Sequence, residues 1–150
     1  MTVNYPLNLP KREFPKSIFL AGTIEMGNSV NWQVRAIEAL STKYDIFNPR
    51  RDNWDTSWEQ NIDNTEFFGQ VSWELENIEN ADIVLFYFAP GTKSPISLLE
   101  LGICSQLNKK VLVICPEGFW RKGNVDIVAS RYKIESFIEL ENALEYLITE

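Results

Sequence analysis

The residue best suited to do chemistry in this chain is Glu100, which lies in the segment SPISLLELG. Ser94 and Pro95 are residue types that begin helices, so Glu100 falls in the second turn of an expected helix. A carboxylate held there can act as a nucleophile, and the helix dipole favours its charged form by about 0.3–1 kcal/mol. We therefore expect an ionised side chain. A solvent-facing carboxylate would do no chemistry, and the residues alone leave that alternative open.

A second group of polar residues follows the strand expected at residues 17–20. Gly22 permits close approach of the backbone to a ligand, and Thr23, Asn28 and Ser29 offer hydrogen-bond donors for its hydroxyl or phosphate groups. Glu25 lies within the same loop and would repel an anion. Capping of the next helix by Asn28 or Ser29 explains these residues equally well.

The loop at residues 50–68 is long, polar and rich in aromatic residues. A loop of this size in a compact domain is usually functional or mobile. We expect Trp54 and Asp55 to contact a ligand, because an indole ring can stack on a flat aromatic group while a carboxylate binds its polar edge. The alternative is a loop anchored by its tryptophans and by internal ion pairs.

Composition restricts the chemistry further. The chain has 150 residues, 45% of them apolar, which suits a single domain with its own core. It contains no histidine, which excludes serine–histidine and cysteine–histidine catalysis and histidine-based metal sites. Cys104 and Cys115 lie in apolar stretches and are expected to be buried thiols in a reducing cytoplasm. We expect neither a metal nor a cofactor.

Charge and hydropathy restrict the partners. The net charge is −7 and no basic run occurs, which argues against duplex nucleic acid. No apolar run approaches the roughly 20 residues that cross a bilayer, and the N-terminus lacks the apolar core of a signal peptide. The P-loop and GxGxxG spacings are absent. These patterns predict a cytoplasmic protein that binds a small molecule.

The elements that must position Glu100 alternate between strand and helix. Short runs of β-branched and aromatic residues separate helical patterns, as in parallel sheets with helices on both faces. We therefore predict one α/β domain over residues 1–150 with a parallel sheet of about five strands, preceded by an extended lead-in at residues 1–16. The expected strands lie at residues 17–20, 44–47, 83–88, 111–115 and 133–137.

Apolar stripes on two helices predict which sides meet the core. The stripes recur at intervals of three and four residues, and Glu74 flanks the first of them. Glu74 is either an ordinary surface acid or, with a pKa raised in a pocket, a proton donor. The first stripe consists of Phe68, Val71, Leu75 and Ile78, and the second of Ile96, Leu99, Ile103 and Leu107.

Four further residues have structural interpretations. Trp73 is expected in the core or at an interface, and Asp82 in a turn or cap. Phe119 and Trp120 are expected to form an exposed aromatic patch, which suits a subunit interface.

Five blocks of this sequence resemble the nucleoside 2-deoxyribosyltransferase superfamily, and in particular its branch of short members. The resemblance covers about residues 17–128 and implies a flavodoxin-like or Rossmann-like three-layer sandwich. It also implies cleavage of the N-glycosidic bond of a nucleoside or nucleotide by a homodimer or higher oligomer that shares active sites. The blocks are, in order, IFLAGTI, FNPRRDNWD, WELENIENADIVLFYF, SLLELG and GFWRKGNVDIV.

The resemblance assigns roles by position. Glu100 takes the place of the family's glutamate nucleophile, and Glu74 that of an acidic residue near the nucleobase. Asn124 stands near an asparagine that a neighbouring subunit supplies. Phe19 replaces a tyrosine that often hydrogen-bonds the nucleophile, and Ser94 replaces an aspartate that commonly precedes it. These two departures put base exchange in doubt more than cleavage itself.

The sequence therefore predicts an enzyme that cleaves N-glycosidic bonds through Glu100 and a glycosyl-enzyme intermediate, by hydrolysis or by deoxyribosyl transfer. The alternative, favoured by the substitutions at Phe19 and Ser94, is a nucleotide-binding sensor or sequestering protein without catalysis. The residues do not distinguish purine from pyrimidine or ribose from 2′-deoxyribose.

Overall fold

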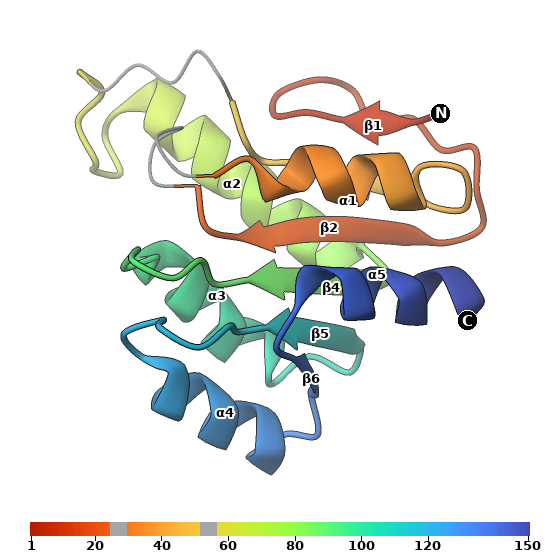
Figure 1. The fold of residues 1–150 in the computed structure, drawn as a ribbon. Helices are drawn as coiled ribbons and strands as arrows, with labels where there is room; N and C mark the ends of the chain where they lie inside the picture. The colour runs from red at the N-terminus through yellow and green to blue at the C-terminus, as the bar shows by residue number, and fades with distance from the viewer. Residues whose placement is uncertain (25–29, 52–56) are drawn as a thin grey trace.

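The structure is a computed structural model that describes residues 1–24, 30–51 and 57–150. In these ranges it contains an all-parallel six-stranded sheet with helices on both faces (Figure 1). The predicted α/β sandwich is confirmed, with one strand more than expected. The elements are β1 (Val3–Asn4), β2 (Ser17–Gly22), α1 (Trp32–Leu40), β3 (Asp45–Phe47), α2 (Thr65–Asn80), β4 (Ile83–Tyr87), α3 (Pro95–Cys104), β5 (Lys110–Ile114), α4 (Lys122–Arg131), β6 (Glu135–Phe137) and α5 (Leu140–Thr149).

The strand order across the sheet is β1-β3-β2-β4-β5-β6. From the central β2 the chain moves outward to β3, returns to β4 and then continues outward to β5 and β6. The winding therefore reverses between β2 and β4, which pair from Ile18 opposite Ile83 to Gly22 opposite Tyr87. In open α/β sheets such a reversal leaves a crevice at the carboxyl ends of the strands, where ligands bind.

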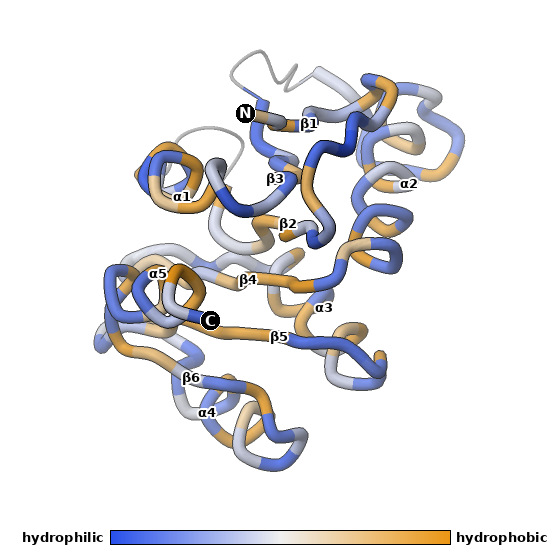
Figure 2. Tube along the Cα trace, turned by 90° about the vertical axis from the view of Figure 1, so that its right-hand side faces the viewer, coloured by the Kyte–Doolittle hydropathy of each residue, from blue (hydrophilic) through white to orange (hydrophobic). Residues whose placement is uncertain are grey.

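Different helices cover the two faces of the sheet. α1 and α5 lie on one face, and α2, α3 and α4 lie on the other, as Figure 1 shows. Successive strand residues point to opposite faces, so Ile18 and Leu20 join the core beneath α1 and α5 while Phe19 packs against Trp73 of α2. Figure 2 shows the apolar strands β4 and β5 between the two helix layers. Burial on both faces explains why the strand sequences are continuously apolar.

The inward side of α3 is not the one that its apolar stripe predicts. The expectation that Ile96, Leu99 and Ile103 face the core is wrong, since all three are exposed. This helix is apolar around most of its circumference, so periodicity cannot identify the inward side. Leu107 lies beyond the helix end and packs against the core. The residues that α3 buries are Ser97, Glu100, Leu101 and Cys104.

α2 follows its predicted stripe only in part. Ile78 is buried as expected, but Phe68 is 51% exposed, and Val71 and Leu75 are half-buried. Two amide side chains occupy the inward side of this helix, where buried polar groups require partners. The other residues that α2 buries are Gln70, Trp73 and Asn77, which places Trp73 in the core.

The N-terminal segment does more than lead into the domain, because its first residues form β1 beside β3. The Asp45 carboxylate accepts hydrogen bonds of 2.9–3.3 Å from the backbone N–H groups of Glu13 and Phe14, which fixes the rest of the segment. Asp82, between α2 and β4, accepts bonds from the N–H and hydroxyl groups of Ser17 at 2.8 and 3.0 Å. Asp82 therefore has a structural role, but it anchors the start of β2 and is not the turn or cap residue that was expected.

Candidate functional site

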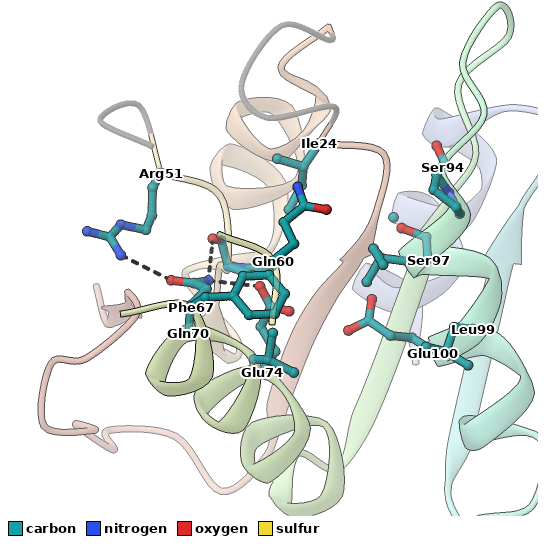
Figure 3. Close-up of a pocket in the computed structure, with 15 residues that line it drawn as sticks. Ile24, Arg51, Gln60, Phe67, Gln70, Glu74, Ser94, Ser97, Leu99 and Glu100 are labelled. Atoms are coloured by element: carbon teal, nitrogen blue, oxygen red, sulfur yellow. Dashed lines mark hydrogen bonds between the residues drawn. The ribbon is translucent and has the colours of Figure 1, made fainter. Parts of the chain in front are cut away.

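A cavity of about 550 Å³ opens between α2 and α3, beside the carboxyl ends of β2 and β3. Figure 3 shows α2 on one side of it and the start of α3 on the other. Its volume is in the range of small-molecule sites, which combine apolar walls with a few polar groups. The apolar lining comes from Ile24, Pro49, Phe67, Val71, Ile96 and Leu99, and the polar lining from Arg51, Gln60, Gln70, Glu74, Ser94, Ser97 and Glu100.

Glu100 lines this cavity from the second turn of α3 and is only 7% exposed. Burial, and secondarily the nearby Glu74, raise the pKa of Glu100 to about 8. The helix dipole, worth about 0.3–1 kcal/mol, does not offset this desolvation. Burial therefore opposes the ionised form that the position of Glu100 in its helix favours. Glu100 does not face bulk solvent, so the alternative of a solvent-facing carboxylate is wrong, and its role as nucleophile stays a prediction.

Glu74 faces the same cavity from α2 (Figure 3). Burial raises its pKa to about 7, against the opposing effect of a hydrogen bond from Gln70. Two carboxyls that share one cavity resist ionising together and titrate as a pair. Between the two interpretations left open for Glu74, the geometry favours an acid in a pocket over an ordinary surface acid.

Gln70 links Glu74 to the segment that follows β3. Its Nε2 donates to Glu74 Oε1 at 2.8 Å and to the Pro49 carbonyl at 3.3 Å, and its Oε1 accepts from Arg51 Nη1 at 3.3 Å. Sequence reasoning missed Gln70 and assigned no role to Arg51. The four-residue spacing from Gln70 to Glu74, which makes neighbours on a helix, was the available signal. Ser97, one turn before Glu100, was missed in the same way.

A buried cluster of hydroxyl groups holds the start of α3. The Thr23 hydroxyl lies 2.7 Å from that of Ser94 and accepts a 2.8 Å bond from the Ala89 N–H group. Ser94 has a left-handed backbone (φ 45°), and its hydroxyl does not cap α3, contrary to expectation. Ser94 lines the cavity, whereas Thr23 is fully buried behind it. Ligand contacts by these two residues stay predictions, and their visible role is to position α3.

Gly22 ends β2 at the cavity wall. Its φ of 131° lies in a region that side chains disfavour, and a Cβ atom here would overlap the backbone of Tyr87 on β4. The lack of a side chain at Gly22 is therefore required for its close approach to the neighbouring strand, and its approach to a ligand stays a prediction.

The other predicted site residues do not line the cavity in the described part of the chain. Phe19 is fully buried, with its ring 6.1 Å from that of Trp73. Asn124 is exposed on α4. Trp54 and Asp55, like Asn28 and Ser29 of the first loop, fall outside the described residues. Their contacts with a ligand stay predictions. The expected capping of α1 by Asn28 or Ser29 is wrong, because the N-cap is Asn31, whose Oδ1 accepts from the Val34 N–H group at 3.4 Å.

The expected aromatic patch is half correct. Phe119 is 4% exposed and packs on Phe88 with ring centroids 4.9 Å apart, so it belongs to the core. Trp120 is 48% exposed, and the cations of Lys93 and Arg121 each lie 4.4 Å from its ring. The long apolar side chain that this segment leaves at the surface is therefore Trp120 alone.

Comparison with known proteins identifies the family of this chain. The sequence model of one family, described as nucleoside 2-deoxyribosyltransferase like, matches residues 15–119. The chain belongs to this family, and the resemblance seen in its sequence blocks is confirmed. The match includes Glu74 and Glu100 but ends before Asn124. A comparison with curated proteins gave no match.

Residues 1–24, 30–51 and 57–150 contain neither a candidate metal site nor a candidate membrane-spanning helix. No group of three or more His, Cys, Asp or Glu side chains in these ranges could hold a metal ion. None of the helices described is long and apolar enough to span a bilayer. Both cysteines, Cys104 and Cys115, are buried and free.

Proposed function

We propose that this protein cleaves the N-glycosidic bond of a nucleoside or nucleotide, with Glu100 as nucleophile and Glu74 as proton donor. The observation that carries the proposal is the meeting of two carboxyls, from α3 and α2, in one cavity at the carboxyl edge of the sheet (Figure 3). Membership of the nucleoside 2-deoxyribosyltransferase-like family supports the substrate class.

The proposed reaction forms one bond and breaks another at the anomeric carbon, C1′. A carboxylate oxygen of Glu100 attacks C1′ while the electron pair of the C1′–N bond leaves with the nucleobase. Glu74 transfers its proton to the departing base, which leaves as a neutral molecule. Water or a second base then attacks C1′ of the ester and gives its proton to Glu74. Glu100 departs as a carboxylate, which restores the starting state.

The mechanism needs a particular charge state of the two carboxyls. The reactive form has Glu74 protonated and Glu100 ionised, so the pair must hold a single proton, which has to pass from Glu100, the group with the higher pKa in the free protein, to Glu74 when substrate binds. Positive charge develops on the sugar in the oxocarbenium-like transition state and stabilises the ionised Glu100 there. Activity should therefore follow a bell-shaped pH profile whose two apparent pKa values belong to the pair.

Substitution of the two carboxyls tests the proposal. Release of free base is measured by chromatography from nucleosides and nucleoside monophosphates. Glu100→Ala should lower kcat at least about a thousandfold, since the covalent step is lost. Glu74→Gln should lower it by about 10²–10⁴-fold, as expected for a general acid. Glu76→Gln, at an exposed position of α2, is the matched control. Full activity of Glu100→Ala would refute the mechanism.

A second candidate is a nucleotide-binding protein without catalysis. Two observations favour it: Phe19 carries no hydroxyl group, and the Ser94 side chain contacts Thr23 and Thr92 at 2.7 and 2.9 Å. Titration calorimetry with the same nucleosides and nucleotides separates the candidates. Tight binding by the unmodified protein without release of base would establish the second one.

We also propose a cytoplasmic homo-oligomer, most simply a dimer, in which Asn124 reaches the cavity of the partner subunit. The exposure of Asn124 and Trp120 supports such a contact, and the buried free thiols fit a reducing compartment. Light scattering should give at least twice the chain mass of 17.4 kDa. A monomer at all concentrations would contradict the shared site.

A further inference from the structure

The Gln70 amide has one orientation that satisfies all of its neighbours. Its N–H groups meet two acceptors, the Pro49 carbonyl and Glu74 Oε1, and its oxygen meets a donor, Arg51 Nη1. A flipped amide would set its oxygen against two acceptors and its NH₂ group against a guanidinium. Gln70 is 1% exposed, so water would not compensate for those losses. Arg51 and Pro49 therefore dictate that an N–H group faces Glu74.

That orientation makes the two oxygens of Glu74 unequal. The NH₂ group of Gln70 can only donate, so Oε1 of Glu74 must accept in both charge states of the carboxyl. The carbonyl oxygen of a protonated carboxyl is its better acceptor, which assigns the proton to Oε2. Figure 3 shows the Gln70 amide between the Arg51 guanidinium and the Glu74 carboxyl, on the α2 side of the cavity.

We propose that Gln70, oriented by Arg51, is a positioning residue that confines the transferable proton of Glu74 to Oε2. The consequence for catalysis rests on the proposed function, because it concerns the proton given to the departing base. Gln70 acts through Glu74, because both N–H groups of its amide are already donated to protein acceptors, Glu74 Oε1 and the Pro49 carbonyl.

The charges around Glu74 allow this effect to be isolated. In the described part of the chain, the titratable groups that face it are Glu100 on α3, with Cys104 one turn beyond, and Arg51 on the far side of Gln70. The Arg51 guanidinium also lies 5.1 Å from the Trp58 ring centroid. The hydrogen bond from Gln70 is the interaction that lowers the pKa of Glu74 against its burial.

The first test is Gln70→Met, which keeps the length of the side chain and removes both N–H donors. We expect kcat for base release to fall about tenfold or more with KM within about twofold, because the acid is misaligned while substrate contacts remain. The alkaline limb of the pH profile should move to higher pH, since the lost donor no longer favours the ionised acid. Gln106→Met, at an exposed turn, is the control. An unmoved limb would overturn the proposal.

A second measurement does not depend on activity. The carboxyl carbons of ¹³C-labelled glutamates are titrated by NMR, and the Glu74 signal is assigned by its loss in Glu74→Gln. In Gln70→Met this signal should titrate at higher pH than in the unmodified protein. An unchanged titration overturns the positioning role even if the protein cleaves nucleosides. An upward shift in a protein that cleaves nothing upholds the Gln70–Glu74 link and refutes the proposed function instead.

Arg51→Met supplies a variant at a half-buried position, in case Gln70→Met does not fold. Without the guanidinium the Gln70 amide can rotate, so the same changes should appear with smaller size. The double variant should be no worse than Gln70→Met alone, because Arg51 acts through Gln70. Additive losses in kcat would contradict that dependence, and thermal unfolding of each variant identifies any loss of folded protein.

Discussion

The two faces of the sheet differ in what their helices bury. Under α1 and α5 the core is mainly aliphatic and aromatic, with Leu40, Leu144 and Leu147 at 0–1% exposure, and the polar side chain that these two helices bury is Gln33. Under α2 and α3 the inward helix positions include amides, a hydroxyl and a carboxyl: Gln70, Asn77, Ser97 and Glu100. Buried polar groups cost free energy unless they find partners. The α1–α5 face is therefore built for stability, and the α2–α3 face gives up part of it to hold a site.

The largest expected effect on stability comes from a substitution in the core under α1 and α5. Leu144→Ala should lower the free energy of unfolding by about 2–5 kcal/mol, because it leaves a cavity in a tightly packed core. Urea unfolding measures the change, and release of base per folded molecule should stay unaltered. A loss below about 0.5 kcal/mol, the size typical of surface changes, would show that the two faces do not differ as described.

The next effect is a dependence of the free energy of unfolding on pH, caused by the two buried carboxyls on the α2–α3 face. Burial raises the folded-state pKa of Glu100 and Glu74 above the ordinary value of 4.5, so between about pH 4.5 and 8 the folded chain binds more protons than the unfolded chain. Stability should therefore fall as pH rises through this window. Glu100→Gln should flatten the fall and stabilise the protein at pH 8 by on the order of 2 kcal/mol.

Denaturant unfolding at a series of pH values checks this prediction, with Glu76→Gln as the exposed control. The sign of the change in the free energy of unfolding is informative. Glu100→Gln should gain stability while it loses activity, as expected where a functional group destabilises the folded protein. A variant that is destabilised at pH 8 would mean that the Glu100 carboxyl contributes to packing.

A smaller effect concerns the end of α2, whose last turn carries no basic residue. Lys109, from the turn before β5, donates instead to the carbonyl oxygens of Ile78, Glu79 and Ala81. Lys109→Met should cost about 1–2 kcal/mol by leaving these carbonyls without their cation. Thermal unfolding measures it against Lys16→Met, an exposed lysine. Equal melting temperatures for the two variants would exclude this role.

The smallest effect completes the comparison of the faces. Leu99→Ala removes the same atoms as Leu144→Ala, but from a residue that is 63% exposed beside the cavity. Its stability should change by no more than about 0.5 kcal/mol. The same urea titration applies, and a loss similar to that of Leu144→Ala would indicate that Leu99 is covered in solution.

The strands were predictable because parallel strands buried on both faces carry continuous apolar runs. The run at 83–88 became β4 (Ile83–Tyr87), and the run at 17–20 became β2, two residues longer than expected. β1 was missed because a two-residue strand has no periodic signal and depends on pairing with β3. The inward side of α3 was missed because Ile96 and Leu99 offer a more apolar stripe than the side that carries Glu100.

Two residues of the candidate site, Glu100 and Glu74, could be predicted from the sequence, and a third, Gln70, could not. Glu100 was identified from residue type and from its place after a strand and loop, and Glu74 was assigned by family resemblance. Gln70 was not found, because its value comes from the partners it meets, of which Pro49 and Arg51 lie about 20 residues earlier in the chain. A local pattern carries no information about such distant partners.

By itself the sequence determined the alternation of strands and helices, the absence of histidine chemistry and the position of Glu100 in its helix. These depend on residue type and short-range spacing. Only the tertiary structure decided that α2 and α3 place Glu74 and Glu100 in one cavity, that burial raises the pKa of both carboxyls, and that Arg51 contacts Gln70. The physical reason is that desolvation and hydrogen-bond geometry arise from groups far apart in the chain, which meet only when the helices pack on the sheet.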